Sequence, residues 1–578
     1  MKSFIGITKV RKLNLMITSF LFLIFAFCEF IYADESQGRQ VKSYNEISFG
    51  KAEKCKHMKD SGPDYSVCTK CGLICDHEVV LDKDGRLLPW TSYNNIINWS
   101  MNFIKNCPTI PTKFGDDPWY LVTSAINKDG TFRRNQNNMG SNVYWAVETL
   151  KKYYAYTGDR EPFYAVRLIL DRVIDYDTPS DWAWPNVPRT QDDSPDGEYT
   201  DQYSEGDKMC MAALGYLNFY KLTGEKKYLD EAMSVTRTVM QHLTVGDEQH
   251  SPLPFRVDLK TGEVLDPYTA DMVYALMLLD ELATMDDKVE GRKYYGGGGG
   301  VYRLKRRILQ KWIFDYPMKN NIWSGYYEDV SSDRDCKPKG HEYDLGGGYY
   351  NLNQQLPMET AKYILQNPKL DRDYKKHIPA LIKWVEERFG ATKRYGATSV
   401  KEQDQCFLEM SSHTPRYASV VAKWFGVTGD PNDREEALKS FALATYSAYN
   451  RYSKDGIAIN YVGLAYESPW FSDCYFDYIL HFINGMAELP EMAPDDEDHI
   501  LGSDSAIRWV RYLPKQIEYK TYEPYGSEIL RLTFEPKVFD GDGKELDKSK
   551  WSFGEYRGVP NVLRITRKDV KHIVIKGK

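Results

Sequence analysis

The sequence predicts a mainly α-helical domain of stacked helical hairpins, followed by a small antiparallel β-domain. Three observations lead to this prediction. Residues 141–176 have the pattern of two helices folded back on each other, the same unit occurs twice more, and helical periodicity gives way to strand-like alternation after residue 494. A lone hairpin cannot bury its apolar face, so repeated units of this kind are expected to stack.

The first hairpin is defined by two apolar faces and the turn between them. Apolar residues recur one helical turn apart on each side of a break, at Val143, Val147, Leu150 and Tyr154 before it and at Phe163, Val166, Leu170 and Val173 after it. Gly158 suits the left-handed residue that ends a helix, Asp159 can cap the next helix, and Pro162 is tolerated only in a first turn. The pattern predicts a tight helical turn.

The two later copies of the hairpin have the same kind of turn sequence between their helices. Thr223-Gly224-Glu225 and Thr428-Gly429-Asp430 each separate two helical patterns. Whether the stack closes into a ring does not follow from the hairpins themselves. Twelve helical segments, enough for six hairpins, are expected near residues 91–106, 141–156, 161–176, 205–222, 226–243, 268–286, 300–313, 353–366, 374–389, 415–427, 433–452 and 472–487.

The C-terminal residues 495–578 have a different pattern. An acidic linker follows Pro494, and segments such as EILRLTF (528–534) alternate apolar and polar residues. Asp540-Gly541-Asp542-Gly543 is a good turn between strands. We expect a small β-domain that packs on the helical domain.

Composition narrows the function classes. The chain has 578 residues, a net charge of -7 and an aromatic share of 14%. The negative charge argues against a surface that wraps nucleic acid. The aromatic residues fit two interpretations: large cores with hairpin packing, or Tyr and Trp faces that stack on sugar rings.

The N-terminal residues 1–33 have the pattern of a secretory signal peptide. Lys2, Lys9, Arg11 and Lys12 precede an apolar run, and Ile31-Tyr32-Ala33 offers a cleavage site before Asp34. We expect a secreted or periplasmic protein; Cys28 offers lipid anchoring as the weaker alternative. No later stretch is apolar enough over ~20 residues to predict a membrane-spanning helix.

Residues 34–88 contain a cysteine cluster formed by Cys55, Cys68, Cys71 and Cys75. Thiolates at this spacing can hold one tetrahedral Zn²⁺, and two disulfides are the equal alternative in an exported protein. Either arrangement would be structural. We expect no cofactor to be required for chemistry.

A resemblance follows from the repeated Thr-Gly-Asp or Thr-Gly-Glu hairpins, the aromatic-rich loops between them and the C-terminal β-domain. Together these features resemble the six-hairpin, or (α/α)-toroid, carbohydrate-active enzymes. The resemblance implies an (α/α)6 toroid as the catalytic domain over residues 89–494, with loops that meet at a mouth. The superfamily includes glycoside hydrolases, polysaccharide lyases and uronyl epimerases, so the reaction must be argued from the site.

The acidic stretch 192–207 is the first candidate site. Crowded carboxylates raise one another's pKa, which is how a general acid stays protonated near neutral pH, and a glycosidase needs two of them. Asp201 and Glu205 are the candidates from this stretch. The alternatives are a solvated acidic loop, a Ca²⁺ site, or simple capping of the next helix by Glu205 and Asp207.

The second candidate site is the stretch 409–417, with His413, Arg416 and Tyr417. In β-elimination of a uronic acid, a cation offsets the carboxylate so that the C5 proton becomes acidic, and a His or Tyr removes that proton. The structural alternative is a helix start, with Thr414 as the cap and Pro415 in the first turn.

Other residues of the expected mouth loops are candidates for substrate binding. For any single aromatic residue among them, core packing is the commoner role. The set is Arg133, Arg134, Asn138, Tyr203, Trp323, Tyr349 and Trp470.

Three functions are therefore expected from the sequence. The leading one is an exported polysaccharide lyase that acts on a uronate-containing glycan, with His413 or Tyr417 as base and Arg416 or Arg133 facing the carboxylate. The second is a glycoside hydrolase that uses carboxylates from 192–207. The third is a glycan-binding protein without catalysis. The expected partner is a polysaccharide or oligosaccharide, and not nucleic acid.

Overall fold

The computed structural model describes residues 51–53, 79–105, 109–112, 115–118, 125–126, 132–133, 139–189, 202–288, 300–325, 352–403, 412–449, 459–460 and 472–578. Within these residues, two sets of six helices form the main domain. The inner helices are α4 (Met139–Thr157), α6 (Gly206–Thr223), α8 (Val273–Lys288), α11 (Gln355–Gln366), α13 (His413–Thr428) and α15 (Ser472–Met486). The outer helices are α5 (Pro162–Asp175), α7 (Lys226–His242), α9 (Gly300–Asp315), α12 (Tyr374–Arg388), α14 (Pro431–Thr445) and α2 (Tyr93–Lys105).

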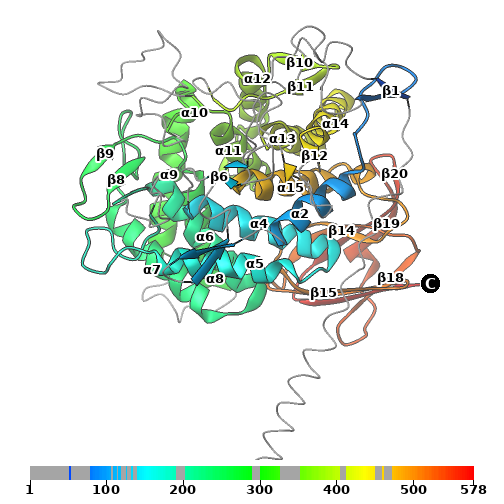
Figure 1. Ribbon diagram of the computed structural model, residues 1–578. Helices are drawn as coiled ribbons and strands as arrows, with labels where there is room; N and C mark the ends of the chain where they lie inside the picture. Colours follow the sequence, from blue (N-terminus) through cyan, green and yellow to red (C-terminus); the bar gives the residue numbers. More distant parts are fainter. Residues whose placement is uncertain are drawn as a thin grey trace, which may run out of the picture.

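The inner helices form a closed ring. Each packs against the next in the order α4, α6, α8, α11, α13 and α15, and α15 packs back against α4. Each inner helix also contacts one outer helix, and five of these pairs are consecutive in the chain. The sixth pair joins α15, the last of these helices in the sequence, to α2, the first (Figure 1). The (α/α)6 toroid expected from the sequence is therefore confirmed.

The twelve helices match the twelve predicted segments to within two residues at every end but two. The segment expected from residue 268 becomes helical only at Val273, and the segment expected to reach 452 ends at Thr445, before strand β12 (Ala448–Tyr449). Inner and outer helices differ as their sequences indicate: α6 is buried on nearly every side, whereas α7 buries one face.

The Thr-Gly-Asp or Thr-Gly-Glu turns use one common set of hydrogen bonds. At the end of α6, Thr223 donates its hydroxyl to the Phe219 carbonyl (2.9 Å) and accepts from the Glu225 amide (3.1 Å). Gly224 then adopts a left-handed conformation with φ of 80°, which a residue with a side chain rarely tolerates. The threonine thus closes the last turn of one helix and directs the chain into the next.

The C-terminal residues form two four-stranded antiparallel sheets, which confirms the predicted β-domain. One sheet has the strand order β14 (His499–Ser503), β17 (Gly526–Arg531), β20 (Val559–Arg567) and β19 (Trp551–Tyr556). The other has the order β15 (Ile507–Leu513), β16 (Gln516–Thr521), β21 (His572–Gly577) and β18 (Pro536–Asp540).

The β-domain packs on the ring at the C-terminal ends of α4 and α6, as Figure 1 shows for the orange and red strands. Arg508 Nε donates to the Lys221 carbonyl at the end of α6 (2.7 Å). The ring of His499 stacks on Tyr156 of α4 with centroids 3.8 Å apart. Five inner helices run in one direction, because each is followed by an outer helix that returns. The sixth, α15, leads from its C-terminal end through η3 into the β-domain, so the β-domain covers one end of the ring.

Short elements complete the described chain. They are β1 (Lys51–Glu53), β2 (Val79–Leu81), β3 (Thr109–Thr112), β4 (Gly115–Pro118), β5 (Ala125–Ile126), β6 (Phe132–Arg133), β7 (Tyr203–Glu205), β8 (Arg256–Asp258), β9 (Val264–Asp266), α10 (Pro317–Asn320), η2 (Pro368–Leu370), β10 (Thr392–Arg394), β11 (Ala397–Ser399), β13 (Ile459–Asn460), η3 (Pro490–Met492) and η4 (Lys548–Lys550). In the part of the chain that the structure describes, no helix is both long and apolar enough to cross a membrane.

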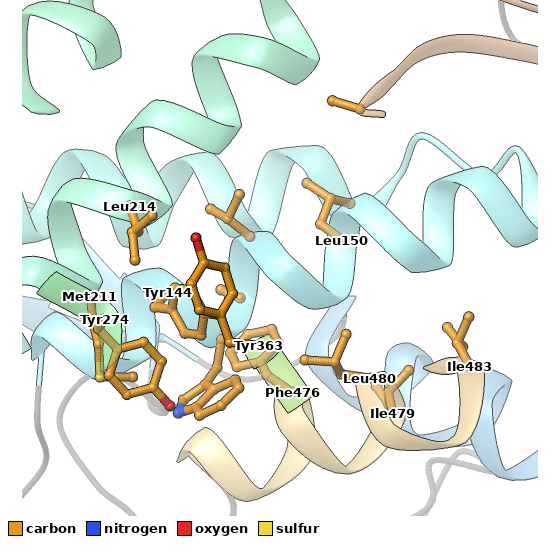
Figure 2. Close-up of a cluster of buried hydrophobic side chains, with 14 of the residues drawn as sticks. Tyr144, Leu150, Met211, Leu214, Tyr274, Tyr363, Phe476, Ile479, Leu480 and Ile483 are labelled. Atoms are coloured by element: carbon orange, nitrogen blue, oxygen red, sulfur yellow. The ribbon is translucent and has the colours of Figure 1, made fainter. Parts of the chain in front are cut away.

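Part of the core lies inside the ring, and the same cluster of buried side chains continues between the inner and outer helices and into the β-domain. Figure 2 shows apolar and aromatic side chains of α4, α6, α8 and α15 that face one another, among them Tyr144, Tyr274 and Leu480. The rings of Tyr144 and Tyr274 meet edge to face with centroids 5.0 Å apart. Aromatic contacts of this kind fix the spacing of the inner helices.

The contact between α4 and α6 tests this packing. A Cβ at Gly215 would lie 2.6 Å from Val143 Cγ1 and 2.9 Å from the Val143 carbonyl oxygen. We expect Gly215→Ala to lower the free energy of unfolding by about 1–3 kcal/mol, because the overlap outweighs a gain of about 1 kcal/mol in helix propensity. Urea denaturation measures the change. Gly300→Ala on α9 is the control, since a Cβ there meets no atom within 4 Å; equal effects at both positions would contradict the close crossing.

Candidate active site

A cluster of buried charged and aromatic side chains lies on the inner helices, and all six helices contribute to it. We call it the inner-ring cluster. Each of its residues is at most 6% exposed. Its members are Trp145 on α4, Asp207 and Lys208 on α6, Asp271 and Tyr274 at the start of α8, Glu359 and Lys362 on α11, His413 and Arg416 on α13, and Asp477 and His481 on α15.

Arg416 is the hub of this cluster. Its Nε donates to Glu359 Oε1 (3.2 Å), and its Nη2 donates to Asp477 Oδ2. Its Nη1 donates to His413 Nδ1 (2.8 Å), and the guanidinium lies over the Trp145 ring at 5.6 Å from the centroid. One cation therefore joins three neighbouring inner helices, and two carboxylates compensate for its burial.

The contact with Arg416 fixes the state of His413. A guanidinium has no acceptor, so His413 Nδ1 must accept and the proton of the neutral ring sits on Nε2. Burial and the nearby Arg416 charge lower the pKa of His413 well below its usual range. Its Nε2 lies 4.0 Å from Glu402 Oε1. His413 is thus a neutral hydrogen-bond donor at Nε2 near pH 7.

His481 is the second buried imidazole. Within the part of the chain that the structure describes, neither of its ring nitrogens has a hydrogen-bond partner. Its Nε2 is 3.8 Å from Asp477 Oδ2, and its ring meets that of Trp145 edge to face at 6.4 Å. Burial and the Arg416 and Lys362 charges lower the pKa of His481 well below its usual range. The neutral ring carries one N–H donor and one acceptor nitrogen, and both lack a partner among the described residues.

The acidic part of the cluster surrounds Lys208. Its Nζ lies 2.5 Å from Asp207 Oδ2 and 3.8 Å from both Glu205 Oε2 and Asp271 Oδ2. Burial, together with the Asp207 charge, raises the pKa of Asp271 well above its usual range. Asp271 therefore retains its proton to a higher pH than an ordinary aspartate does.

The structure brings several predicted site residues together and separates others. His413, Arg416 and Glu205 lie in or beside the inner-ring cluster. Tyr417 is buried on α13, but its hydroxyl donates to Glu386 on α12, which directs the side chain toward the outer helices. It does not reach Arg416's partners on the inner helices.

The predicted substrate-binding aromatic residues lie away from the cluster's contacts where they are described. Trp323 is fully buried and packs in the core, with its carbonyl accepting from the Asn353 amide. Tyr203 lies on β7, under the guanidinium of Arg256. Arg133 is placed only as a backbone position in β6. Outside the described residues are Asp201, Arg134, Asn138, Tyr349, Trp470, Cys55, Cys68, Cys71 and Cys75.

Sequence reasoning missed Asp271, Glu359, Asp477 and His481. A signal was present for the last two: the α15 segment SDCYFDYILHFINGM contains two acids, Asp473 and Asp477, and one histidine in an apolar helix. Charged groups in a helix that is buried all round require partners, so their spacing of four residues predicts a shared site. Among the described residues, no group of His, Cys, Asp and Glu side chains could hold a metal ion.

Comparisons with known proteins give similarity in structure only. No protein-family model matches the chain, and no curated protein matches it in sequence. The chain is similar to a D-mannose isomerase, at 13% identity over 69% of this chain and 97% of that chain, with a TM-score of 0.49. It is similar to a family 76 glycoside hydrolase from a bovine Bacteroides thetaiotaomicron strain, at 11% identity over 69% and 78% of the two chains, with a TM-score of 0.45.

A polysaccharide lyase is also similar, at 12% identity over 68% of this chain and 52% of that chain, with a TM-score of 0.40. These proteins catalyse different kinds of reaction. Identities this low do not carry a substrate or a reaction from one protein to another.

The burial of Arg416 gives a stability prediction. Arg416→Met leaves Glu359 and Asp477 without their shared cation, so we expect the free energy of unfolding to fall by about 3–5 kcal/mol. Arg167→Met is the matched control, because that arginine pairs with Glu225 at a half-exposed position and its loss should cost about 1 kcal/mol or less. Denaturant unfolding of both variants measures the difference, and similar losses would contradict the role of Arg416 as a hub.

The two histidines give a pH prediction. Their pKa values are lower in the folded protein than in the unfolded chain, for which the usual value is 6.5. As pH falls below about 6.5 the unfolded chain binds protons that the folded protein does not, so stability falls with acidification by up to ~1.4 kcal/mol per pH unit for each histidine. Asp271 has the opposite effect on stability. Because its pKa is raised in the folded protein, the folded protein binds a proton that the unfolded chain does not, and Asp271 adds stability as the pH falls.

His481→Gln removes one histidine from this balance. We expect thermal denaturation between pH 5 and 7 to show a shallower loss of stability in the variant than in the unaltered protein. An unchanged slope would mean that His481 titrates alike in both states.

Proposed function

We propose that the protein is a carbohydrate-active enzyme that moves a proton on its substrate, and specifically a polysaccharide lyase acting on a uronate-containing glycan. The observation that carries the proposal is His481, a buried neutral imidazole whose two nitrogens have no hydrogen-bond partner among the described residues. Leaving such a group without a partner costs about 1–3 kcal/mol, and a substrate would remove that cost.

The proposal gives the two imidazoles different roles. His481 takes the C5 proton of the uronate, the C4–O bond breaks, and a C4–C5 double bond forms in the sugar. His413, whose Nε2 carries the proton of the neutral ring, donates a hydrogen bond to the departing oxygen, and that oxygen takes its proton from the His481 imidazolium, so that both rings end neutral. Because Arg416 bonds His413 and shares Asp477 with His481, it holds both rings in their positions.

Two cations lie near His481. The charges of Arg416 and Lys362 both act on His481, and Glu359 pairs with each cation. A substrate carboxylate facing them would be offset, which makes the C5 proton more acidic. Glu359 and Asp477 keep the cations in place before the substrate binds.

Export fits this function. The N-terminal residues 1–33 carry the signal pattern described above and lie outside the described residues. A uronate polysaccharide is too large to enter a cell intact, so an exported or periplasmic enzyme would meet it first. The structural Zn²⁺ or disulfides at Cys55, Cys68, Cys71 and Cys75 would stabilise such a protein outside the cell. A Ca²⁺ site in 192–207 belongs to the same proposal.

A second candidate function is glycoside hydrolysis, and the raised pKa of Asp271 favours it. A protonated Asp271 could act as general acid, with Asp207 or Glu205 as the second carboxyl group that a glycosidase needs. Even without Asp271, carboxyl groups outnumber cations in and beside the cluster, an excess that suits a neutral sugar better than an anionic one: the carboxyl groups are Glu205, Asp207, Glu359, Glu402 and Asp477, and the cations are Lys208, Lys362 and Arg416. A glycan-binding protein without turnover is the third reading.

Product chemistry distinguishes these functions. We expect pectate, alginate or a glycosaminoglycan incubated with the protein to yield unsaturated ends that absorb in the near ultraviolet. His481→Gln and His413→Gln should each lower kcat by roughly 10²–10⁴. Tyr417→Phe is the control for the alternative base, because its hydroxyl bonds toward the outer helices.

Other outcomes would select another function. Reducing sugar released without ultraviolet absorbance, and lost in Asp271→Asn, would establish hydrolysis. Loss of the unsaturated product in Tyr417→Phe but not in His481→Gln would overturn the assignment of the base. Saturable glycan binding with no product after long incubation would support the glycan-binding reading.

A further inference from the structure

A second feature lies at the other end of the ring. A cavity of about 960 Å³ separates the C-terminal halves of the inner helices from the β-domain. All of its lining residues are described, and they include Glu148 and Lys152 on α4, Lys362 on α11 and Lys423 on α13. Its volume is at the upper end of the range for small-molecule sites, which is sufficient for a short oligosaccharide.

The lining has an excess of positive charge. It contains eight Lys and Arg residues and six Asp and Glu residues. Two of those carboxylates are further neutralised by arginines outside the lining, since Arg557 bonds Glu488 and Arg567 bonds Glu528. The cavity therefore favours an anion although the whole chain is acidic.

Lys152 is the clearest sign of a missing partner. In the described part of the chain its ammonium makes no ion pair, and it donates only to the Ser503 carbonyl (3.3 Å). Burial and the nearby Lys151 and Lys423 charges lower the pKa of Lys152 to about 8. Lys423 shares Glu488 with Arg557. Lys151 pairs with Glu148 (2.7 Å), so Lys152 is the one of these three lining cations that makes no ion pair among the described residues, although the charges of Glu148 and Asp504 partly offset the two lysines.

The remaining walls fit a sugar. Five aromatic side chains line the cavity, together with amides and hydroxyls that can bond sugar hydroxyl groups. The aromatic residues are Tyr144, Tyr363, Tyr525, Trp551 and Tyr556. An inorganic anion would use the lysines but not the aromatic faces.

We propose that this cavity binds an anionic oligosaccharide, with a carboxylate or sulfate group against Lys151, Lys152 and Lys423 and sugar rings against the aromatic walls. This inference rests on the proposed substrate class and not on the proposed reaction. The cavity and the inner-ring cluster meet at α11, where Lys362 lines the cavity and pairs with Glu359 of the cluster.

Binding measurements on the full chain test this inference. Calorimetry uses the His481→Gln protein, which slows turnover, with tetrasaccharides of galacturonate, of alginate and of heparan sulfate, and with inorganic sulfate. We expect one acidic tetrasaccharide to bind, and Lys152→Gln or Lys423→Gln to weaken its Kd about tenfold each. Lys226→Gln is the matched control, because that lysine lies exposed on α7 and pairs with Asp230.

Folding is checked separately. Since the Lys152 ammonium is disfavoured in the unliganded protein, Lys152→Gln should melt at the same or a higher temperature. Weaker binding with a retained melting temperature supports the cavity; weaker binding that tracks a lower melting temperature in each variant overturns it.

The two proposals fail in different ways. Unsaturated product formed from a uronate glycan whose binding is unaffected in Lys152→Gln and Lys423→Gln would overturn the cavity and leave the lyase standing. Binding that depends on these lysines, without any product, would leave the cavity standing and overturn the lyase. Sulfate that binds as tightly as every tetrasaccharide, or no binding by any probe, would overturn the assignment of a saccharide.

Discussion

The buried guanidinium of Arg416 is the constraint on which the inner ring depends. Placing a charge on the axis of a helical ring is unfavourable unless carboxylates and hydrogen bonds surround it. Arg416 meets that condition with Glu359 on α11 and Asp477 on α15, so three adjacent inner helices must hold one relative height and rotation. The apolar contacts around Tyr144, Tyr274 and Leu480 close the ring, and the ion pairs specify its register.

The parallel direction of the inner helices gives the two ends of the ring opposite electrostatic character. Helix N-termini stabilise negative charge and C-termini stabilise positive charge. Asp207 lies in the first turn of α6, and lysines gather toward the C-terminal halves of α4, α6 and α13, at Lys151, Lys152, Lys221 and Lys423. Helix ends alone would account for one lysine at each terminus. They do not account for Lys151, Lys152 and Lys423 lying close enough together to lower the pKa of Lys152.

Local patterns predicted the helices because each hairpin carries its own signals. Thr223, Gly224 and Glu225 determine a turn through contacts within five residues, so the turn can be predicted from the local sequence alone. The pairing of α2 with α15, which completes the set of six helix pairs, cannot be predicted in this way, because nothing near residue 93 or residue 486 indicates that the two helices meet. The residues of the inner-ring cluster also divide into those that the local sequence predicts and those that only the fold brings together. His413 and Arg416 lie three residues apart and were predicted together, whereas Asp271, Glu359 and His481 join them only through closure of the ring.

The burial of His481 links stability to chemistry. A ring built only for stability would place Leu or Phe at that position, since an imidazole without hydrogen bonds weakens the core. Neighbouring cations keep the ring neutral, which lessens the cost of burial and also preserves a lone pair for a proton. The rigidity supplied by Arg416 and Trp145 is what makes this arrangement useful, because a proton acceptor acts only when its nitrogen is held within hydrogen-bond reach of the substrate. The buried imidazole of His481, which weakens the core, is thus held in place by the buried ion pairs of Arg416.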